Sequence, residues 1–96
     1  MKLFKFEWDC GRQGNLRGMF LAEQSEIDGL MGQNIVFGEV LGKHSYIEGI
    51  LEEEDLEEVE LQTGDIDVLK RVFDLPQGGT IQGYNPLDYD WEEDDE

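Results

Sequence analysis

Two side chains could support nucleophilic or metal chemistry: the single cysteine, Cys10, and the single histidine, His44. A reactive thiol needs basic surroundings and a nearby base, which Lys5, Arg12 and His44 could supply to Cys10. Two isolated residues do not form a zinc signature, and one cysteine excludes an internal disulfide. We therefore predict a strand-end cysteine and a loop histidine in a protein that is not an enzyme and holds no metal or cofactor.

The stretch GEVLGKHS, residues 38–45, resembles a phosphate-binding loop only superficially. Such a loop has four residues between its glycines and a serine or threonine directly after the lysine. Here three residues separate Gly38 from Gly42, and His44 follows Lys43. The spacing favours a connection between two strands.

Carboxylates in alternate positions near the C-terminus could bind calcium. Asp88, Asp90 and Glu92 supply such positions, but no glycine or distal glutamate completes a calcium loop. Paired carboxylates for glycoside hydrolysis have no recognisable cleft around them. The acids are therefore better explained by their collective charge.

Acidic residues gather in two segments that contain no basic residue. Residues 48–60, EGILEEEDLEEVE, hold eight acids, and residues 88–96, DYDWEEDDE, hold seven. We predict a partner-binding surface made by Glu52, Glu53, Glu54, Asp55, Glu57, Glu58, Glu60, Asp88, Asp90, Trp91 and Glu92. The alternative for any such run is a solvated face that serves only solubility.

The charge of the whole chain is strongly segregated. The 96 residues contain 7 basic and 24 acidic side chains, a formal charge of −17. Residues 1–22 hold four basic and two acidic groups, which leaves three basic and 22 acidic groups for residues 23–96. A field of this sign repels nucleic acid and anionic membranes and attracts basic proteins. We place Lys5, Arg12 and Arg17 away from the acidic surface, where they could serve self-association.

Hydrophobic periodicity predicts a hairpin followed by alternating strands and helices. Residues 2–9 alternate strictly, with Phe4, Phe6 and Trp8 on one face, and residues 16–22 return as its partner strand. Further strands are predicted over 33–41, 44–53 and 57–62, the last with Val59 and Leu61 inward. If the strands over 44–53 and 57–62 pair, their acids oppose one another, which is destabilising without a functional reason.

Two helices are predicted from apolar spacing and capping residues. Ser25 would cap a helix over 25–32, and Gly64 or Asp65 would cap one over 64–75. The second helix carries Ile66, Leu69, Val72 and Phe73 on one side. A short strand over 80–89 could follow it.

These elements predict an α+β fold: one antiparallel sheet of about five strands, in the order β-β-α-β-β-β-α, packed with one or two short helices. Residues 1–87 would form a single domain, and residues 88–96 an acidic tail. The N-terminus lacks the apolar core of a signal peptide, and no window is long enough to span a membrane. We expect a cytoplasmic protein with no membrane contact.

The strings FGEVLGKHSYIEG and GGTIQGYNPLDY resemble small uncharacterised proteins of bacteria and their phages. In size and charge the chain is also similar to acidic DNA-mimic inhibitors of the anti-restriction and anti-CRISPR type, which share no motif. This resemblance implies an inhibitor that occupies a nucleic-acid-binding site, and it assigns no role to an individual residue.

Charge spacing agrees with that implication. Side chains on one face of a strand recur every 6.6–6.8 Å or so, whereas duplex DNA carries, on each strand, one phosphate per about 3.4 Å of helix axis. Two adjacent acidic strands and the tail would approach the density of DNA. The predicted partner is a basic nucleic-acid-binding protein of the host, with no direct nucleic-acid binding, and a homodimer is left open. The alternative is a protein–protein interaction module that uses an apolar sheet face or the GYNPLDY segment.

Overall fold

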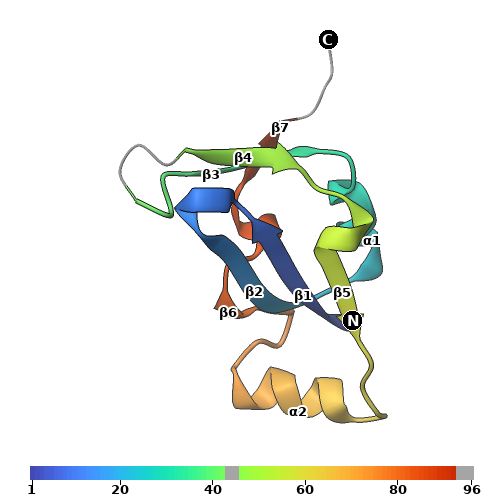
Figure 1. The fold of residues 1–96 in the computed structure, drawn as a ribbon. Coiled ribbons are helices and arrows are strands. Elements are labelled where there is room, and N and C mark those ends of the chain that lie inside the picture. The colour runs from blue at the N-terminus through green and yellow to red at the C-terminus, as the bar shows by residue number, and fades with distance from the viewer. Residues whose placement is uncertain (43–45, 93–96) are drawn as a thin grey trace.

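A computed structural model of the chain contains two antiparallel β-sheets and two short helices (Figure 1). The structure describes residues 1–42 and 46–92, with the backbone alone described for Gln13 and for residues 90–92. His44 and the last four acids of the tail therefore lie outside the described residues. The predicted α+β class is confirmed.

The elements follow the predicted order. The strands are β1 (Lys2–Asp9), β2 (Asn15–Ala22), β3 (Asn34–Gly38), β4 (Ile47–Ile50), β5 (Leu56–Val59), β6 (Gly79–Gly83) and β7 (Asp90–Glu92). The helices are α1 (Gln24–Leu30) and α2 (Asp65–Val72), and the 3-10 turns are η1 (Gly11–Gln13), η2 (Glu53–Asp55) and η3 (Pro86–Asp88). Strand β6 corresponds to the short strand predicted over 80–89, and β7 lies in the segment predicted to be a tail.

The predicted N-terminal hairpin is confirmed and forms the centre of the larger sheet. Strands β1 and β2 pair along their full length, from Lys2 opposite Ala22 to Asp9 opposite Asn15. Strand β5 pairs with β1 and β6 pairs with β2, so sheet A has the order β5-β1-β2-β6. The alternation that predicts the hairpin also decides which side chains face inward, because successive side chains point to opposite faces.

The predicted antiparallel strands divide between two sheets. Strands β4, β3 and β7 form a separate three-stranded sheet B that lies across the inner face of sheet A (Figure 1). The strands over 44–53 and 57–62 do not pair with each other, since β4 belongs to sheet B and β5 to sheet A. Both sheets have an apolar inner face, and by facing each other they bury both of these faces in one core.

The core fills the space between the sheets. Buried side chains come from sheet A, from sheet B and from the inner side of α1: Phe4, Phe6, Leu16, Phe20, Ala22, Ile27, Leu30, Ile35, Phe37, Ile47 and Leu51. The Phe37 ring of sheet B lies 5.7 Å from the Phe6 ring and 5.2 Å from the Trp8 ring of sheet A, centroid to centroid. Phe37 therefore links the two sheets.

Helix α1 closes one side of the core, with Ile27 and Leu30 buried. Its N-cap is Glu23 and not the predicted Ser25, because Glu23 and Glu26 form a reciprocal capping box. The Glu23 side chain accepts from the Glu26 backbone N–H, and the Glu23 backbone N–H donates to the Glu26 carboxylate at 3.0 Å. Two acids thus replace the usual hydroxyl cap.

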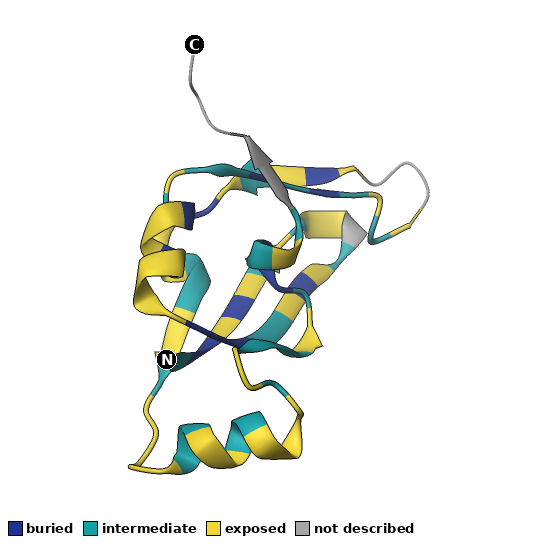
Figure 2. Cartoon of the chain, turned by 180° about the vertical axis from the view of Figure 1, so that it is seen from behind, coloured by how far each residue is buried: buried dark blue, intermediate teal, exposed yellow. Residues whose placement is uncertain are grey.

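Helix α2 is confirmed with Gly64 as its N-cap, but none of its residues is buried. It lies apart from sheet B, beside the end of sheet A where β1 begins (Figures 1 and 2). The segment after it covers Leu21, because a Cβ added at Gly78 would lie 2.8 Å from the Leu21 carbonyl oxygen. No helix in the described ranges is long and apolar enough to cross a bilayer.

Candidate acidic binding surface

The acidic segment leaves sheet B at Leu51 and enters sheet A at Leu56. Leu51 is completely buried, and Leu56 packs against the core cluster. The backbone of Leu51 is held at both ends, because its N–H donates to the Gln33 carbonyl and its carbonyl accepts from the Gly32 N–H. The acids between the two leucines must therefore turn outward, and η2 is fixed at the boundary between the sheets.

A reciprocal cap shapes this acid turn, which we define as Glu52 to Asp55. The Glu52 backbone N–H donates to the Asp55 carboxylate at 2.9 Å, and the Glu52 side chain accepts from the Asp55 backbone N–H. Glu53 and Glu54 make no such bond and are exposed. Backbone N–H groups at the start of a turn stabilise nearby carboxylates, so these two bonds stabilise the charges of Glu52 and Asp55.

Like charges nevertheless crowd in the acid turn. The pKa of Glu52 is raised above its usual value, first because its carboxyl shares a hydrogen bond with the Glu54 carboxyl, and also because Glu54 and Asp55 repel its charge. None of the ion pairs found among the described residues includes an acid of this turn. The turn is therefore a local concentration of negative charge that no cation of the described residues pairs with.

Strand β5 continues the acidic segment at the edge of sheet A. Glu57 lies opposite Lys5 of β1, and Glu58 lies opposite Phe4. Because side chains alternate along a strand, Glu57 and Glu58 point to opposite sides of the sheet. The Glu58 carboxylate is 3.3 Å from the Lys2 ammonium, so this acid is neutralised within the chain. The predicted inward position of Leu61 is also wrong, because Leu61 follows β5 and is 36% exposed.

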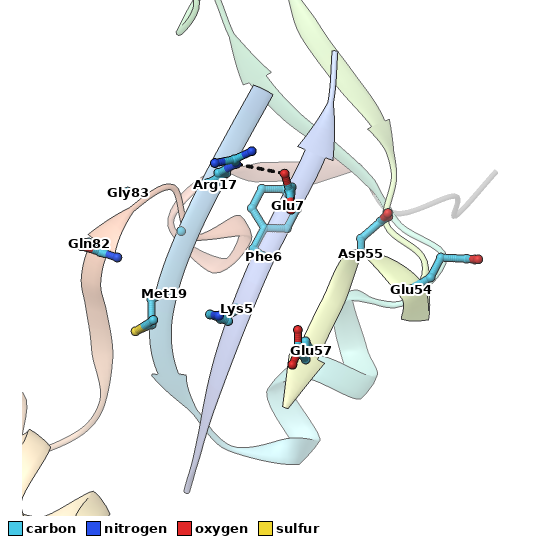
Figure 3. Close-up of a pocket in the computed structure, with 11 residues that line it drawn as sticks. Lys5, Phe6, Glu7, Arg17, Met19, Glu54, Asp55, Glu57, Gln82 and Gly83 are labelled. Atoms are coloured by element: carbon cyan, nitrogen blue, oxygen red, sulfur yellow. Dashed lines mark hydrogen bonds and ion pairs between the residues drawn. The ribbon is translucent and has the colours of Figure 1, made fainter. Parts of the chain in front are cut away.

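A shallow groove of about 670 Å³ crosses the outer face of sheet A beside the acid turn. Figure 3 shows Glu54, Asp55 and Glu57 along one side of this groove, Lys5 and Met19 on its floor, and Gln82 on the far side. Gly18, Gly83, Phe6, Glu7 and Arg17 complete its lining.

The two cations in this groove correct the prediction that they lie away from the acids. The Arg17 guanidinium Nε is 2.9 Å from a Glu7 carboxylate oxygen, and Lys5 lies opposite Glu57 in the sheet register (Figure 3). The alternation of residues 2–9 and 16–22 carries the signal for this arrangement, since Lys5, Glu7 and Arg17 all occupy outward positions. The net charges of residues 1–22 and 23–96 do not show this arrangement, because they say nothing of which face of the sheet a side chain lies on.

The second acidic segment lies in a different part of the fold. Asp88 belongs to η3, where its carboxylate accepts a hydrogen bond of 2.6 Å from the Thr80 hydroxyl. Residues Asp90, Trp91 and Glu92 form β7, which pairs with β3 in sheet B. The structure therefore does not place these residues on the strand that carries Glu57 and Glu58. The predicted site divides into an acid turn with β5 and a separate segment at η3 and β7.

The candidates for covalent or metal chemistry have few partners here. The Cys10 pKa is raised, mainly by burial of the thiol and also by the charge of Asp9. A raised pKa keeps the thiol protonated and lowers its reactivity. Among residues 1–42 and 46–92, no group of three or more histidine, cysteine or acidic side chains could hold a metal ion. The chemistry that remains open to the acid turn and the groove beside it is the binding of cationic groups.

Comparison of the chain with protein-family models, curated proteins and solved structures finds no match.

Proposed function

We propose that the protein is a non-enzymatic inhibitor, of phage or mobile-element type, that occupies a nucleic-acid-binding site on a defence or DNA-processing protein of the host. The observation that carries this proposal is the acid turn: four successive carboxylates, held outward by two core leucines, without an ion-pair partner among the described residues. A basic site that holds phosphates is the complement of such a surface.

The density of charge in the acid turn supports mimicry of a polyanion. A 3-10 turn rises about 2.0 Å per residue, so the acid turn carries more charge per unit length of its axis than one DNA strand, which has one phosphate per about 3.4 Å of helix axis. The acid turn, and not a pair of adjacent acidic strands, carries this density, because β4 and β5 belong to different sheets. Glu57 extends the charge along the groove, whereas Glu58 contributes less because Lys2 neutralises it.

The groove gives a specific place for a cationic side chain of the partner. Glu54, Asp55 and Glu57 line one side, and Met19 offers an apolar contact to the methylene stem of a lysine or arginine. We therefore expect the partner to insert at least one basic side chain into the groove while neighbouring basic groups contact the acid turn.

A set of isosteric substitutions tests the proposal. The triple variant Glu53→Gln, Glu54→Gln, Glu57→Gln removes three charges from the surface, and Asp28→Asn, Glu48→Gln, Asp74→Asn removes three charges elsewhere. Affinity purification from host lysate at low and high salt would identify the partner. We expect the first variant to lose the partner and the second to keep it.

Two further measurements complete the test. Binding should weaken steeply with salt, and duplex DNA should compete for the partner. A partner that is retained by both triple variants, or is indifferent to salt and to DNA, would contradict DNA mimicry.

One observation favours a second candidate, a protein–protein interaction module whose acidity serves only solubility. Tyr46, which directly precedes β4, and Ile50, at the end of β4, are exposed, and with Trp8 and Cys10 they line a cavity of about 290 Å³. The GYNPLDY segment is used internally instead, since Asn85 and Pro86 are buried and Tyr89 packs 4.6 Å from Phe37, centroid to centroid. For this module, Tyr46→Ser with Ile50→Ser should abolish partner binding, and the first triple variant should leave it intact.

A further inference from the structure

Strand β4 leaves one edge of sheet B open to a further strand. The order of the sheet is β4-β3-β7, and no strand in the described part of the chain pairs with the other side of β4 (Figure 1). The Leu51 N–H and carbonyl both bond to residues 32–33, next to β3. Because these directions alternate along an antiparallel strand, Gly49 also bonds toward β3, whereas the N–H and carbonyl groups of Glu48 and Ile50 point to the open edge.

A cavity of about 290 Å³ lies along this open edge. Residues 46–50 line one side of it, and the end of the β1–β2 hairpin lines the other with Trp8, Asp9 and Cys10. No residue of β3 lines the cavity, so it lies on the side of β4 that faces away from β3. The open backbone groups of β4 and a hollow beside them therefore coincide.

Gly49 keeps space free in this cavity. Its backbone is not in the left-handed region, so no turn geometry requires a glycine there. A Cβ added at Gly49 would lie 3.5 Å from Cη2 of the Trp8 indole, which is an ordinary contact, so close packing does not require a glycine either. A glycine inside a strand often marks a place where another backbone approaches. An aromatic side chain on a neighbouring strand can cover such a glycine, and here it would also contact the Trp8 indole.

The edges of the two sheets differ in how they resist a further strand. Strand β5 carries Glu57 and Glu58, and charged side chains on an edge oppose pairing. At the open edge of β4, Ile50 is 51% exposed, and Tyr46, directly before the strand, is 57% exposed. The acid of this strand, Glu48, belongs to no ion pair found among the described residues. A basic side chain opposite Glu48 would complement it, and the formal charge of −17 attracts basic segments.

We propose that β4 is a docking edge for an extended basic segment of a partner protein, which adds to sheet B as an antiparallel strand. The backbone of this segment bonds to Glu48 and Ile50, and its side chain opposite Gly49 is aromatic and packs against Trp8. Such a position suits a large side chain, because residue pairs without mutual hydrogen bonds bring their side chains closest together.

The pairing also defines the sequence pattern of the segment. The side chain opposite Ile50 is apolar and the one opposite Glu48 is basic, so the pattern is apolar, aromatic, basic from the N-terminal end of the segment. The docking edge shares no lining residue with the groove beside the acid turn. This inference therefore goes beyond the proposed inhibitor function and does not depend on it.

A synthetic peptide of this pattern, acetyl-TTVYKTK-amide, tests the pairing. Heteronuclear NMR of the labelled protein measures the dissociation constant and the exchange rate of each amide hydrogen. At a peptide concentration ten times the dissociation constant, exchange of the Glu48 and Ile50 amides should slow about tenfold. The amides of Glu53 and Glu54 in the acid turn should exchange as before, because the peptide does not bind there.

A modified peptide separates backbone pairing from attraction between charges. N-methyl groups on the valine and on the lysine after the tyrosine leave the charge and the side chains unchanged but remove the two N–H donors that face β4. This peptide should bind about tenfold more weakly or worse. In the protein, Ile50→Pro removes an N–H on the open edge, where a strand tolerates proline, and should weaken the unmodified peptide to a similar extent.

A pair of charge variants completes the test. Glu48→Gln should weaken the unmodified peptide severalfold, whereas Glu53→Gln, which removes the same charge from the acid turn, should leave its binding unchanged. Circular dichroism confirms that each variant is folded. An unmodified peptide that does not bind, or an N-methylated peptide that binds equally well, would overturn the inference. So would slowed exchange at Glu53 and Glu54 in place of Glu48 and Ile50.

Discussion

Substitution of Leu51 by alanine should destabilise the fold and disturb the acid turn together. The Leu51 side chain is completely buried at the point where the chain leaves sheet B. Its two backbone hydrogen bonds, to Gln33 and Gly32, do not involve the side chain and should persist. The substitution therefore removes only the apolar anchor of the turn.

The expected cost follows from the burial. Truncation of a fully buried leucine costs about 2–5 kcal/mol, and we take about 3 kcal/mol for this site. For a domain of this size, each kcal/mol lowers the Tm by about 4–8 °C, so the Tm should fall by about 12–24 °C. Leu61→Ala is the matched control: Leu61 is 36% exposed, and its truncation should cost about 1 kcal/mol or less.

Urea unfolding followed by far-ultraviolet circular dichroism measures both free energies. Partner binding, measured at a temperature where both variants are folded, should be weakened by Leu51→Ala and unchanged by Leu61→Ala. If both variants lose the same small amount of stability, Leu51 does not anchor the segment. Unchanged partner binding in a destabilised Leu51→Ala protein would show that the position of the acid turn does not matter for function.

Three further predictions concern single residues. Gly18→Ala should lower the free energy of unfolding in urea by about 1–3 kcal/mol, because a Cβ at Gly18 would collide with the Tyr84 carbonyl oxygen. Gly29→Ala in α1 is the control: its Cβ meets open space, and the free energy of unfolding should rise by about 0.5–1 kcal/mol. The raised pKa of Glu52 contributes stability that is present below its usual pKa of 4.5 and is lost as pH rises through the folded-state pKa. Glu52→Gln should accordingly reduce the fall in the urea midpoint between pH 4 and pH 7, and an unaltered profile would contradict the crowding at this turn. Alkylation of Cys10 at mildly alkaline pH should be slower in the folded protein than in urea, because burial and Asp9 raise the thiol pKa; equal rates would show a freely reactive thiol.

Local signals predicted the elements of the fold well. Strict alternation in residues 2–9 identified both β1 and its inward face, and the spacing of Ile66 and Leu69 identified α2. These features depend on residues close in sequence, for which the period of hydrophobicity is a direct physical signal. Serine is a common N-cap, so the sequence predicts Ser25 as the cap of α1, whereas the reciprocal Glu23–Glu26 bonds start the helix two residues earlier.

The choice of strand neighbours could not be predicted in the same way. Alternation in residues 47–50 and 56–59 specifies which side chains face a core, but it does not say which strand lies alongside. Here Leu51 and Leu56 enter the same core from two different sheets, so the chain crosses between sheets instead of forming a hairpin. The acids of this segment therefore lie on a turn and on one edge strand, and not opposite one another on paired strands.

The position of β5 at the edge of sheet A gives its acids a second physical role. An exposed edge presents unpaired backbone groups to other chains, and charged side chains on the edge oppose such pairing. Glu57 and Glu58 point to the two sides of this edge, while Glu53 and Glu54 lie on the turn before it. The two roles can be separated: Glu57→Gln with Glu58→Gln should increase aggregation at high protein concentration, measured by light scattering, whereas Glu53→Gln with Glu54→Gln should reduce partner binding and leave scattering unchanged. Equal effects of the two pairs in both assays would mean that only the total charge matters, because neither the edge nor the turn would then have a role of its own.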